Sequence, residues 1–203
     1  MKLVEYPDRD LLMMQLADRI TSDLNESLLT HDWATLCVPG GTTPAPLFDI
    51  LSSVDLDWSR VYVLLNDERW VPESSDRSNT KLLRERLLIG RAAPANLVPL
   101  YRAAEQPEDV IGDLIKGIEE VLPLSVLLLG MGADMHTASL FPGADKLAEA
   151  LNHDAPPLMA MRAPGAPEPR ITLTAPVLSG ALRTHLLIVG DEKRAALDVA
   201  ARR

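Results

Sequence analysis

Apolar residues along the chain follow two spacings. Between Leu12 and Leu28 they recur every four residues behind a potential cap at Asp8, which is typical of an amphipathic helix. Elsewhere they form short, nearly continuous runs that are typical of buried strands. We predict helices over 8–30, 44–53, 80–89, 107–121 and 191–203, and strands over 33–39, 60–66, 96–101, 124–130 and 184–190.

Alternation of strands and helices indicates an α/β fold with a mostly parallel, Rossmann-like sheet and helices on both faces. Ligands in such folds bind beyond the carboxyl ends of the strands. The segments to examine are therefore 39–43, 66–79, 130–136 and 190–193. We expect 67–79 to be a long polar loop, and a short helix to begin near His136. Weaker extended segments are expected over 157–164 and 170–174.

Composition limits the class of protein further. The 203 residues are 47% hydrophobic and 24% charged, as expected for one folded domain. A formal net charge of −9 disfavours a nucleic-acid partner. The single cysteine, Cys37, allows no intramolecular disulfide, which fits a reducing compartment. With neither a signal peptide nor a membrane-length apolar run, we expect a cytoplasmic protein, monomeric or weakly dimeric.

The first candidate site is "VPGGTTPAP", which joins a strand to a helix. Gly40 and Gly41 would let backbone N–H groups turn toward a ligand, and Thr42 and Thr43 would add hydroxyl donors. This arrangement favours an anion, but it also fits an ordinary turn with a capping threonine. The ending G-K-[ST] of a Walker A loop is missing, which argues against ATP hydrolysis.

The second candidate is "NDERWVP", directly after a strand. Asp67 or Glu68 would serve as a base there, and Arg69 would clamp a phosphate. The alternative is an ordinary solvated charge cluster. The position at the carboxyl end of a strand favours function.

The third candidate is "GMGADMH", which follows the most apolar strand. It nearly matches the dinucleotide fingerprint G-x-G-x-x-G, but Met135 replaces the last glycine, and the segment about 20 residues further on, "NHDAPP", does not resemble the strand end that would carry a ribose-binding acid. His136 is either a catalyst or an ordinary packed histidine. No histidine spacing typical of a metal site occurs, so we expect no metal and no cofactor.

Taken together, these segments resemble the 6-phosphogluconolactonase family, whose superfamily includes glucosamine-6-phosphate deaminase and ribose-5-phosphate isomerase. The matching pieces occur in the family's order: "GGTTP" (40–44), "DERWVP" (67–72) with "SN" (78–79), "GMGADMHTASLFPG" (130–143), "RITLT" (170–174) and "GDEK" (190–193). Each is weak alone, but together they span the chain from the first strand to the last helix.

The resemblance implies hydrolysis of 6-phospho-D-glucono-1,5-lactone to 6-phosphogluconate in the pentose phosphate pathway. His136 would be the general base, and Asp134 would either orient it or shape the turn. Asp67 and Asn79 would hold sugar hydroxyls or order the loop. The phosphate would rest on the 40–43 loop with cationic contacts from Arg69, Arg170 and Lys193.

Two departures from the family pattern stand out. The usual D-G-H carries Met135 instead of glycine, which costs about 1–2 kcal/mol if the position needs a positive φ. The chain is also expected to lack the strand and helix that usually end this domain. Two other functions remain open: a phosphosugar isomerase or deaminase with Asp67 as base, and a non-catalytic phosphosugar-binding protein.

Overall fold

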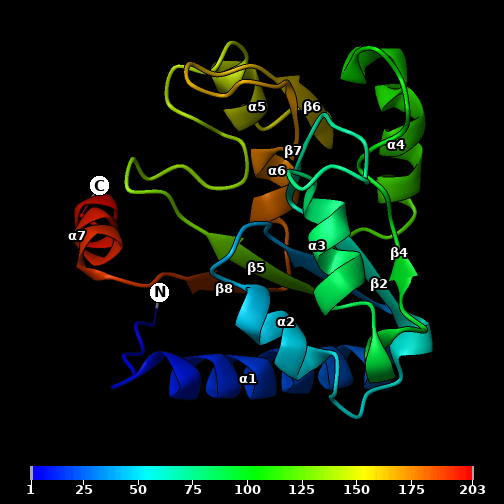
Figure 1. Ribbon diagram of the computed structural model, residues 1–203, viewed down its shortest axis with the longest axis vertical. Helices are drawn as coiled ribbons and strands as arrows, with labels where there is room; N and C mark the ends of the chain where they lie inside the picture. Colours follow the sequence, from blue (N-terminus) through cyan, green and yellow to red (C-terminus); the bar gives the residue numbers. More distant parts are fainter. Residues whose placement is uncertain (1, 203) are drawn as a thin grey trace.

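Five parallel strands form the central sheet of the computed structural model, which describes residues 2–202 (Figure 1). Their order is β4-β2-β1-β5-β8. The strands are β1 (Ala34–Val38), β2 (Val61–Leu65), β4 (Asn96–Leu97), β5 (Val126–Gly130) and β8 (Arg183–Leu187). All five residues of β1, in the middle of this order, are buried. This explains why the strand is nearly continuous in apolar residues, with Thr35 the one polar position.

Helices connect these strands. They are α1 (Arg9–Thr30), α2 (Ala45–Leu51), α3 (Asn79–Arg86), α4 (Ile111–Glu119), α5 (Leu147–Leu151), α6 (Ala175–Ser179) and α7 (Asp191–Ala200). Single turns of 3₁₀ helix occur at η1 (Trp58–Arg60), η2 (Gly90–Ala92) and η3 (Pro107–Asp109). As expected, Asp8 caps α1, since its side chain accepts a hydrogen bond from the backbone N–H of Leu11 at 2.8 Å.

The order of the strands places helices on both faces of the sheet. The chain runs from β1 through β2 to β4, then returns to β5 and β8 on the other side of β1. Because such crossovers are right-handed, the connections before and after this reversal lie on opposite faces. Accordingly, α1 and α2 pack together on one face, and α4 lies across the sheet from α1 (Figure 1). The predicted α/β class is confirmed.

A second, antiparallel sheet was not predicted. It has the order β3-β7-β6, from β3 (Asp67–Arg69), β7 (Arg170–Leu173) and β6 (Leu158–Met161). The prediction of a long polar loop over 67–79 is therefore wrong at its ends, because Asp67–Arg69 form β3 and α3 begins at Asn79. Asn66 joins the two sheets, because its N–H donates to the Val38 carbonyl and its own carbonyl accepts from Leu173, both at 2.9 Å. The three polar residues of β3 become a strand only through this distant partner.

The predicted helix beginning near His136 is also wrong. Residues 131–146 form irregular turns, and the next helix, α5, begins at Leu147. Met135 and Ala138 have φ angles of 71° and 50°. A right-handed helix cannot pass through these left-handed conformations. The segment instead leaves β5 as a loop and places its side chains above the end of the sheet.

Candidate active site

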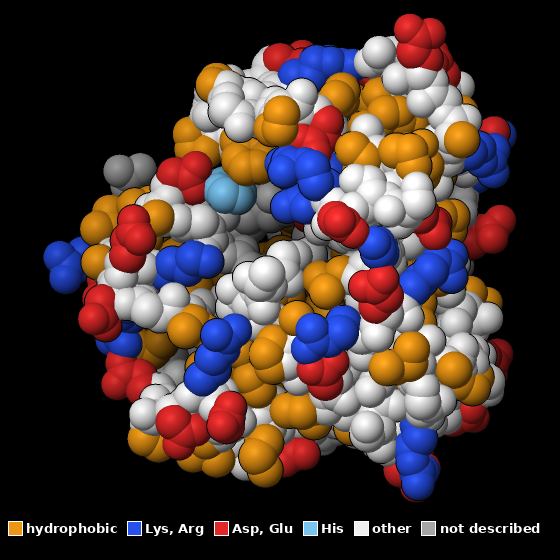
Figure 2. Space-filling view, viewed as in Figure 1, with side chains coloured by type: hydrophobic (Ala, Val, Ile, Leu, Met, Phe, Trp, Pro, Cys, Tyr) orange, Lys and Arg blue, Asp and Glu red, His pale blue; other side chains and the backbone are white. Residues whose placement is uncertain are grey.

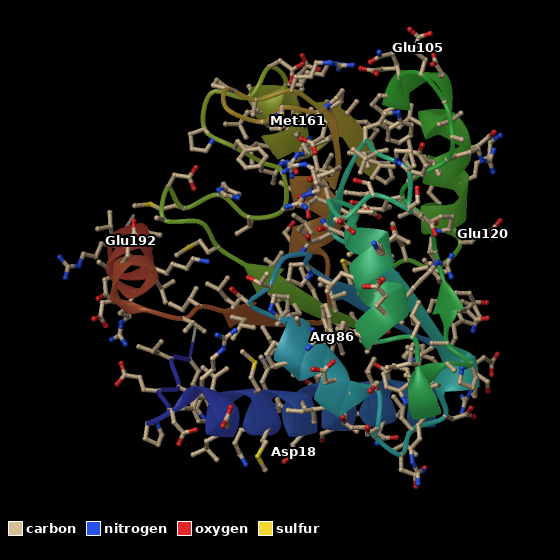
Figure 3. All side chains as sticks on the ribbon, viewed as in Figure 1. Asp18, Arg86, Glu105, Glu120, Met161 and Glu192 are labelled. Carbon is tan, nitrogen blue, oxygen red and sulfur yellow. The ribbon has the colours of Figure 1, made fainter. Side chains whose placement is uncertain are left out.

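One cleft of about 320 Å³ lies at the carboxyl ends of the parallel strands. Of the predicted site residues, all except Asp134 and Glu68 line this cleft: Gly40, Gly41, Thr42, Thr43, Asp67, Arg69, Asn79, His136, Arg170 and Lys193. Lys and Arg side chains border the hollow on the face shown in Figure 2. Side chains from several elements converge in the space between α7 and α3 (Figure 3). A cleft with this lining suits a small anion, although the formal charge of the whole chain is −9.

The glycine pair after β1 shapes one wall. Gly41 has a φ of 88°, which favours glycine. Gly40 is needed for space, because a Cβ there would lie 2.0 Å from the side chain of Asn79. Helix α2 has Pro44 as its N-cap and no side-chain capping bond, so the capping-threonine alternative is wrong. The hydroxyl-bearing residues Thr42 and Thr43 line the cleft instead.

His136 and Asp134 form a hydrogen-bonded pair at the cleft. The imidazole Nδ1 lies 2.5 Å from Asp134 Oδ1, and the backbone N–H of His136 donates to the same oxygen at 3.3 Å. Partial burial raises the pKa of Asp134, but the hydrogen bonds from His136 outweigh it and the pKa is lowered overall. A carboxylate on Nδ1 favours the tautomer with its proton on Nδ1, leaving Nε2 as the basic nitrogen.

A tight turn positions this pair. The N–H of Gly132 donates to the His136 carbonyl at 2.9 Å, and the N–H of Met135 donates to the Gly132 carbonyl at 3.0 Å. Met135 has the positive φ that the D-G-H pattern implies for this position. Its side chain packs against the hydrophobic cluster of Met131, Ala196 and Leu197. Burial of that side chain offsets the backbone strain, so the turn forms without a glycine.

Two arginines face each other at the opposite wall. Arg69 of β3 and Arg170 of β7 are directly paired across the strands, and the Nε of each is buried without a hydrogen-bond partner in the described chain. Burial, and next the charge of Arg69, lower the pKa of Arg170. Like charges placed opposite one another are unfavourable without an anion between them. This pair is therefore a strong candidate anion contact.

Phe141 was missed by the sequence analysis. Its ring centroid lies 4.3 Å from that of His136, and the Arg170 guanidinium carbon lies 5.6 Å from the Phe141 centroid. The aromatic ring thus contacts both the imidazole and the guanidinium and helps to hold them in place. Its position five residues after His136 was the only available signal, because no periodicity marks a loop.

Neighbouring acids in "DER" have different roles. Glu68 is fully buried, and its carboxylate accepts from the N–H groups of Asn79 and Thr80 at 2.8 and 2.7 Å, at the start of α3. Glu68 therefore anchors the start of α3 and does not line the cleft. Asp67 does line it, and one of its oxygens accepts a 2.6 Å hydrogen bond from the hydroxyl of Ser139. The strand alternation separates the two acids.

Two features are absent from the described residues, namely a cluster of metal ligands and a membrane-spanning helix. No three His, Cys, Asp or Glu side chains within residues 2–202 lie where they would hold a metal ion together. No helix in the same range is both long and apolar enough to cross a membrane. His31, His153 and His185 do not line the cleft, and His185 instead pairs with Asp23 of α1 at 2.7 Å.

Fold and site together define an α/β protein with a polar cleft lined by Arg69, Arg170 and Lys193, next to a His–Asp pair. The family model of glucosamine-6-phosphate isomerases/6-phosphogluconolactonase matches residues 7–203. The chain belongs to this family.

Similar proteins carry one of the two family names. A 6-phosphogluconolactonase of Mesorhizobium japonicum is 42% identical over 197 residues, covering 96% of this chain and 83% of the relative. One of Rhizobium meliloti is 43% identical over 200 residues, covering 97% and 85%. The crystal structure of a 6-phosphogluconolactonase from Shewanella baltica superposes with a TM-score of 0.93 at 36% identity, covering 96% and 84%. The lactonase branch is therefore the nearer comparison for function.

Proposed function

We propose that this protein is an enzyme that hydrolyses 6-phospho-D-glucono-1,5-lactone to 6-phospho-D-gluconate in the oxidative pentose phosphate pathway. The observation that carries the proposal is the His136–Asp134 pair beside a cleft lined by Arg69, Arg170 and Lys193. The curated relatives bear the name of this activity over nearly the full length of the chain. The reaction needs a base, a proton donor and an anion site, and the cleft offers each.

His136 is the proposed general base. Asp134 holds the imidazole through Nδ1, so Nε2 takes a proton from water as the water oxygen bonds to the lactone C1. The tetrahedral intermediate then collapses, the bond from C1 to the ring oxygen breaks, and the imidazolium returns the proton to that oxygen. The products are a carboxylic acid, which ionises, and a free hydroxyl. No electron transfer is involved, so the residues present are sufficient for each step.

The phosphate is proposed to rest against the 40–43 loop with Arg69, Arg170 and Lys193 supplying positive charge. These residues line the same cleft as His136. Arg69 and Arg170 carry buried Nε groups that have no hydrogen-bond partner within residues 2–202 and that an anion would satisfy. Binding energy from the phosphate then orients the distant lactone carbonyl at the base.

Asp67 and Asn79 are proposed to contact the sugar. The Asn79 amide donates to the backbone carbonyl of Asp67 at 3.2 Å, so the two residues form one unit of the wall. The carboxylate and the amide would form hydrogen bonds with sugar hydroxyl groups, whereas the arginines would bind the phosphate. We further propose that the enzyme works in the cytoplasm, as a monomer or weak dimer.

An assay of the purified protein on the lactone tests the proposal. Acid release above the spontaneous rate, abolished by heating the protein, is the expected result. Deamination or isomerisation of an aminosugar phosphate, lost in Asp67→Asn and retained in His136→Ala, would instead establish the isomerase branch of the family. Ligand binding without either reaction would make the protein a phosphosugar-binding protein.

A further inference from the structure

Ser139 connects the histidine loop to the smaller sheet. It is fully buried, and its hydroxyl donates to Asp67 Oδ2 at 2.6 Å. Its backbone N–H donates to the Thr172 hydroxyl oxygen at 3.1 Å. Asp67 and Thr172 are themselves direct cross-strand partners of β3 and β7. Ser139, three residues after His136, is therefore hydrogen-bonded to two residues, Asp67 and Thr172, that face each other on neighbouring strands.

The direction of each hydrogen bond in this cluster follows from its neighbours. The Thr172 hydroxyl donates to the Leu173 carbonyl at 3.0 Å, which leaves its oxygen free to accept from the Ser139 N–H. The Ser139 hydroxyl has one proton, which it donates to Asp67 Oδ2. In this contact the Ser139 hydroxyl therefore donates and the Asp67 carboxylate accepts.

Ser139 does not line the cleft, whereas Asp67 does. One carboxylate oxygen of Asp67 is thus occupied by a buried donor, and the carboxylate as a whole stands at the wall where substrate would lie. The same serine fixes the loop that bears His136. Its hydroxyl thereby ties the Asp67 carboxylate to this loop, although Ser139 itself does not line the cleft.

We propose that Ser139 is a positioning residue that acts through Asp67, holding this carboxylate in place at the wall of the cleft and aimed at a substrate hydroxyl. The proposal rests on the proposed function of the cleft. A hydrogen bond to a charged group that is lost from a closed site lowers kcat/KM by about ten- to a hundredfold. Because Ser139 acts on sugar binding, its replacement should mainly raise KM, whereas replacement of His136 should mainly lower kcat.

A double-mutant cycle on the full chain tests this role. Ser139→Ala, Asp67→Asn and the combined variant are assayed with the lactone, and their affinity for 6-phosphogluconate is measured by calorimetry. We expect Asp67→Asn to cost much less in the Ser139→Ala background than in the wild type, because both changes remove one unit. Losses that multiply independently would overturn the proposal.

Ser125→Ala is the matched control. Ser125 is also buried, and its hydroxyl oxygen accepts from the N–H of Thr35 at 2.9 Å, but it does not line the cleft. A loss in Ser139→Ala no larger than that in Ser125→Ala would overturn the proposal. If Ser139→Ala does not fold, Ser139→Cys replaces it, since a thiol fills the space but is a weak donor. The same rise in KM is then expected, and unchanged KM would overturn the proposal.

Different results would overturn the proposed function and the proposed role of Ser139. A wild-type protein that does not hydrolyse the lactone would overturn the proposed function. An active wild type whose KM and 6-phosphogluconate affinity are indifferent to Ser139→Ala and Ser139→Cys would overturn only the role of Ser139.

Discussion

Gly132 lies directly against the side chain of His136. A Cβ at Gly132 would stand 2.4 Å from the imidazole Nδ1 and 2.5 Å from Asp134 Oδ1. Both distances are shorter than real Cβ contacts allow. Because Gly132 has no side chain, Asp134 and His136 have room to form their hydrogen bond beside it.

Gly132→Ala is therefore expected to displace His136 and lower kcat by about 10²-fold or more, within the range of general-base assistance. The fold should survive, since the change is confined to a loop. Steady-state kinetics with the lactone measures the effect. Gly117→Ala is the control, because a Cβ at that helical position meets nothing within 4 Å. An equal kcat in both variants would show that the turn does not position the base.

His136→Ala should lower kcat by about 10²–10⁴-fold and change KM little, because the phosphate contacts remain. Replacement of His31 or His153 should leave both constants unchanged, since neither residue lines the cleft. His185→Ala should lower the melting temperature, because it removes the contact with buried Asp23, but not kcat. A His136→Ala enzyme with near-normal kcat would eliminate the proposed mechanism.

Substitutions at Met135 compare the cost of its positive φ with the stabilisation that its side-chain packing provides. Met135→Gly relieves the positive φ but loses contact with Met131 and Leu197, whereas Met135→Ala loses the contact and keeps the strain. Thermal denaturation should rank Met135→Ala as the least stable of the three proteins. Activity of Met135→Gly should equal or exceed that of the wild type. Equal melting temperatures for the two variants would show that the φ angle carries no measurable cost.

Phosphate or 6-phosphogluconate should raise the melting temperature of the wild type, with about 2.7 kcal/mol of stabilisation at a hundred times the dissociation constant. Gly41→Val should reduce this shift, because valine disfavours a φ of 88°. Gly165→Val is a matched control, since Gly165 also has a positive φ and open space around it but lies outside the cleft. An undiminished shift in Gly41→Val would place the phosphate elsewhere.

Acid stability depends on Asp134. Its pKa lies below the ordinary value of 3.8 in the folded protein, so its contribution is complete above that pH and is lost as the pH falls through the lower, folded value. The stability difference between wild type and Asp134→Asn should therefore be largest above pH 3.8 and shrink below it. Urea midpoints across this range measure it. A difference that grows toward acid would contradict the direction of the shift.

The sequence by itself determined the elements whose signal is local. The four-residue spacing of α1, its Asp8 cap and the apolar runs of β1, β2 and β5 each depend on neighbours in the chain. These elements establish the α/β class and the edge of the sheet where ligands bind. Short motifs at that edge then supplied the residues of the cleft.

Only the tertiary structure decided the features that depend on contacts between residues far apart in the sequence. β3 is a strand because β7, about a hundred residues later, supplies its hydrogen bonds. Glu68 is an anchor for α3 and Asp67 a wall of the cleft because pairing turns adjacent side chains to opposite sides. Left-handed turns that no periodicity encodes bring Phe141 into the cleft and Ser139 against Asp67 behind its wall. Their conformations are selected by contacts with another sheet, and local sequence carries no record of those contacts.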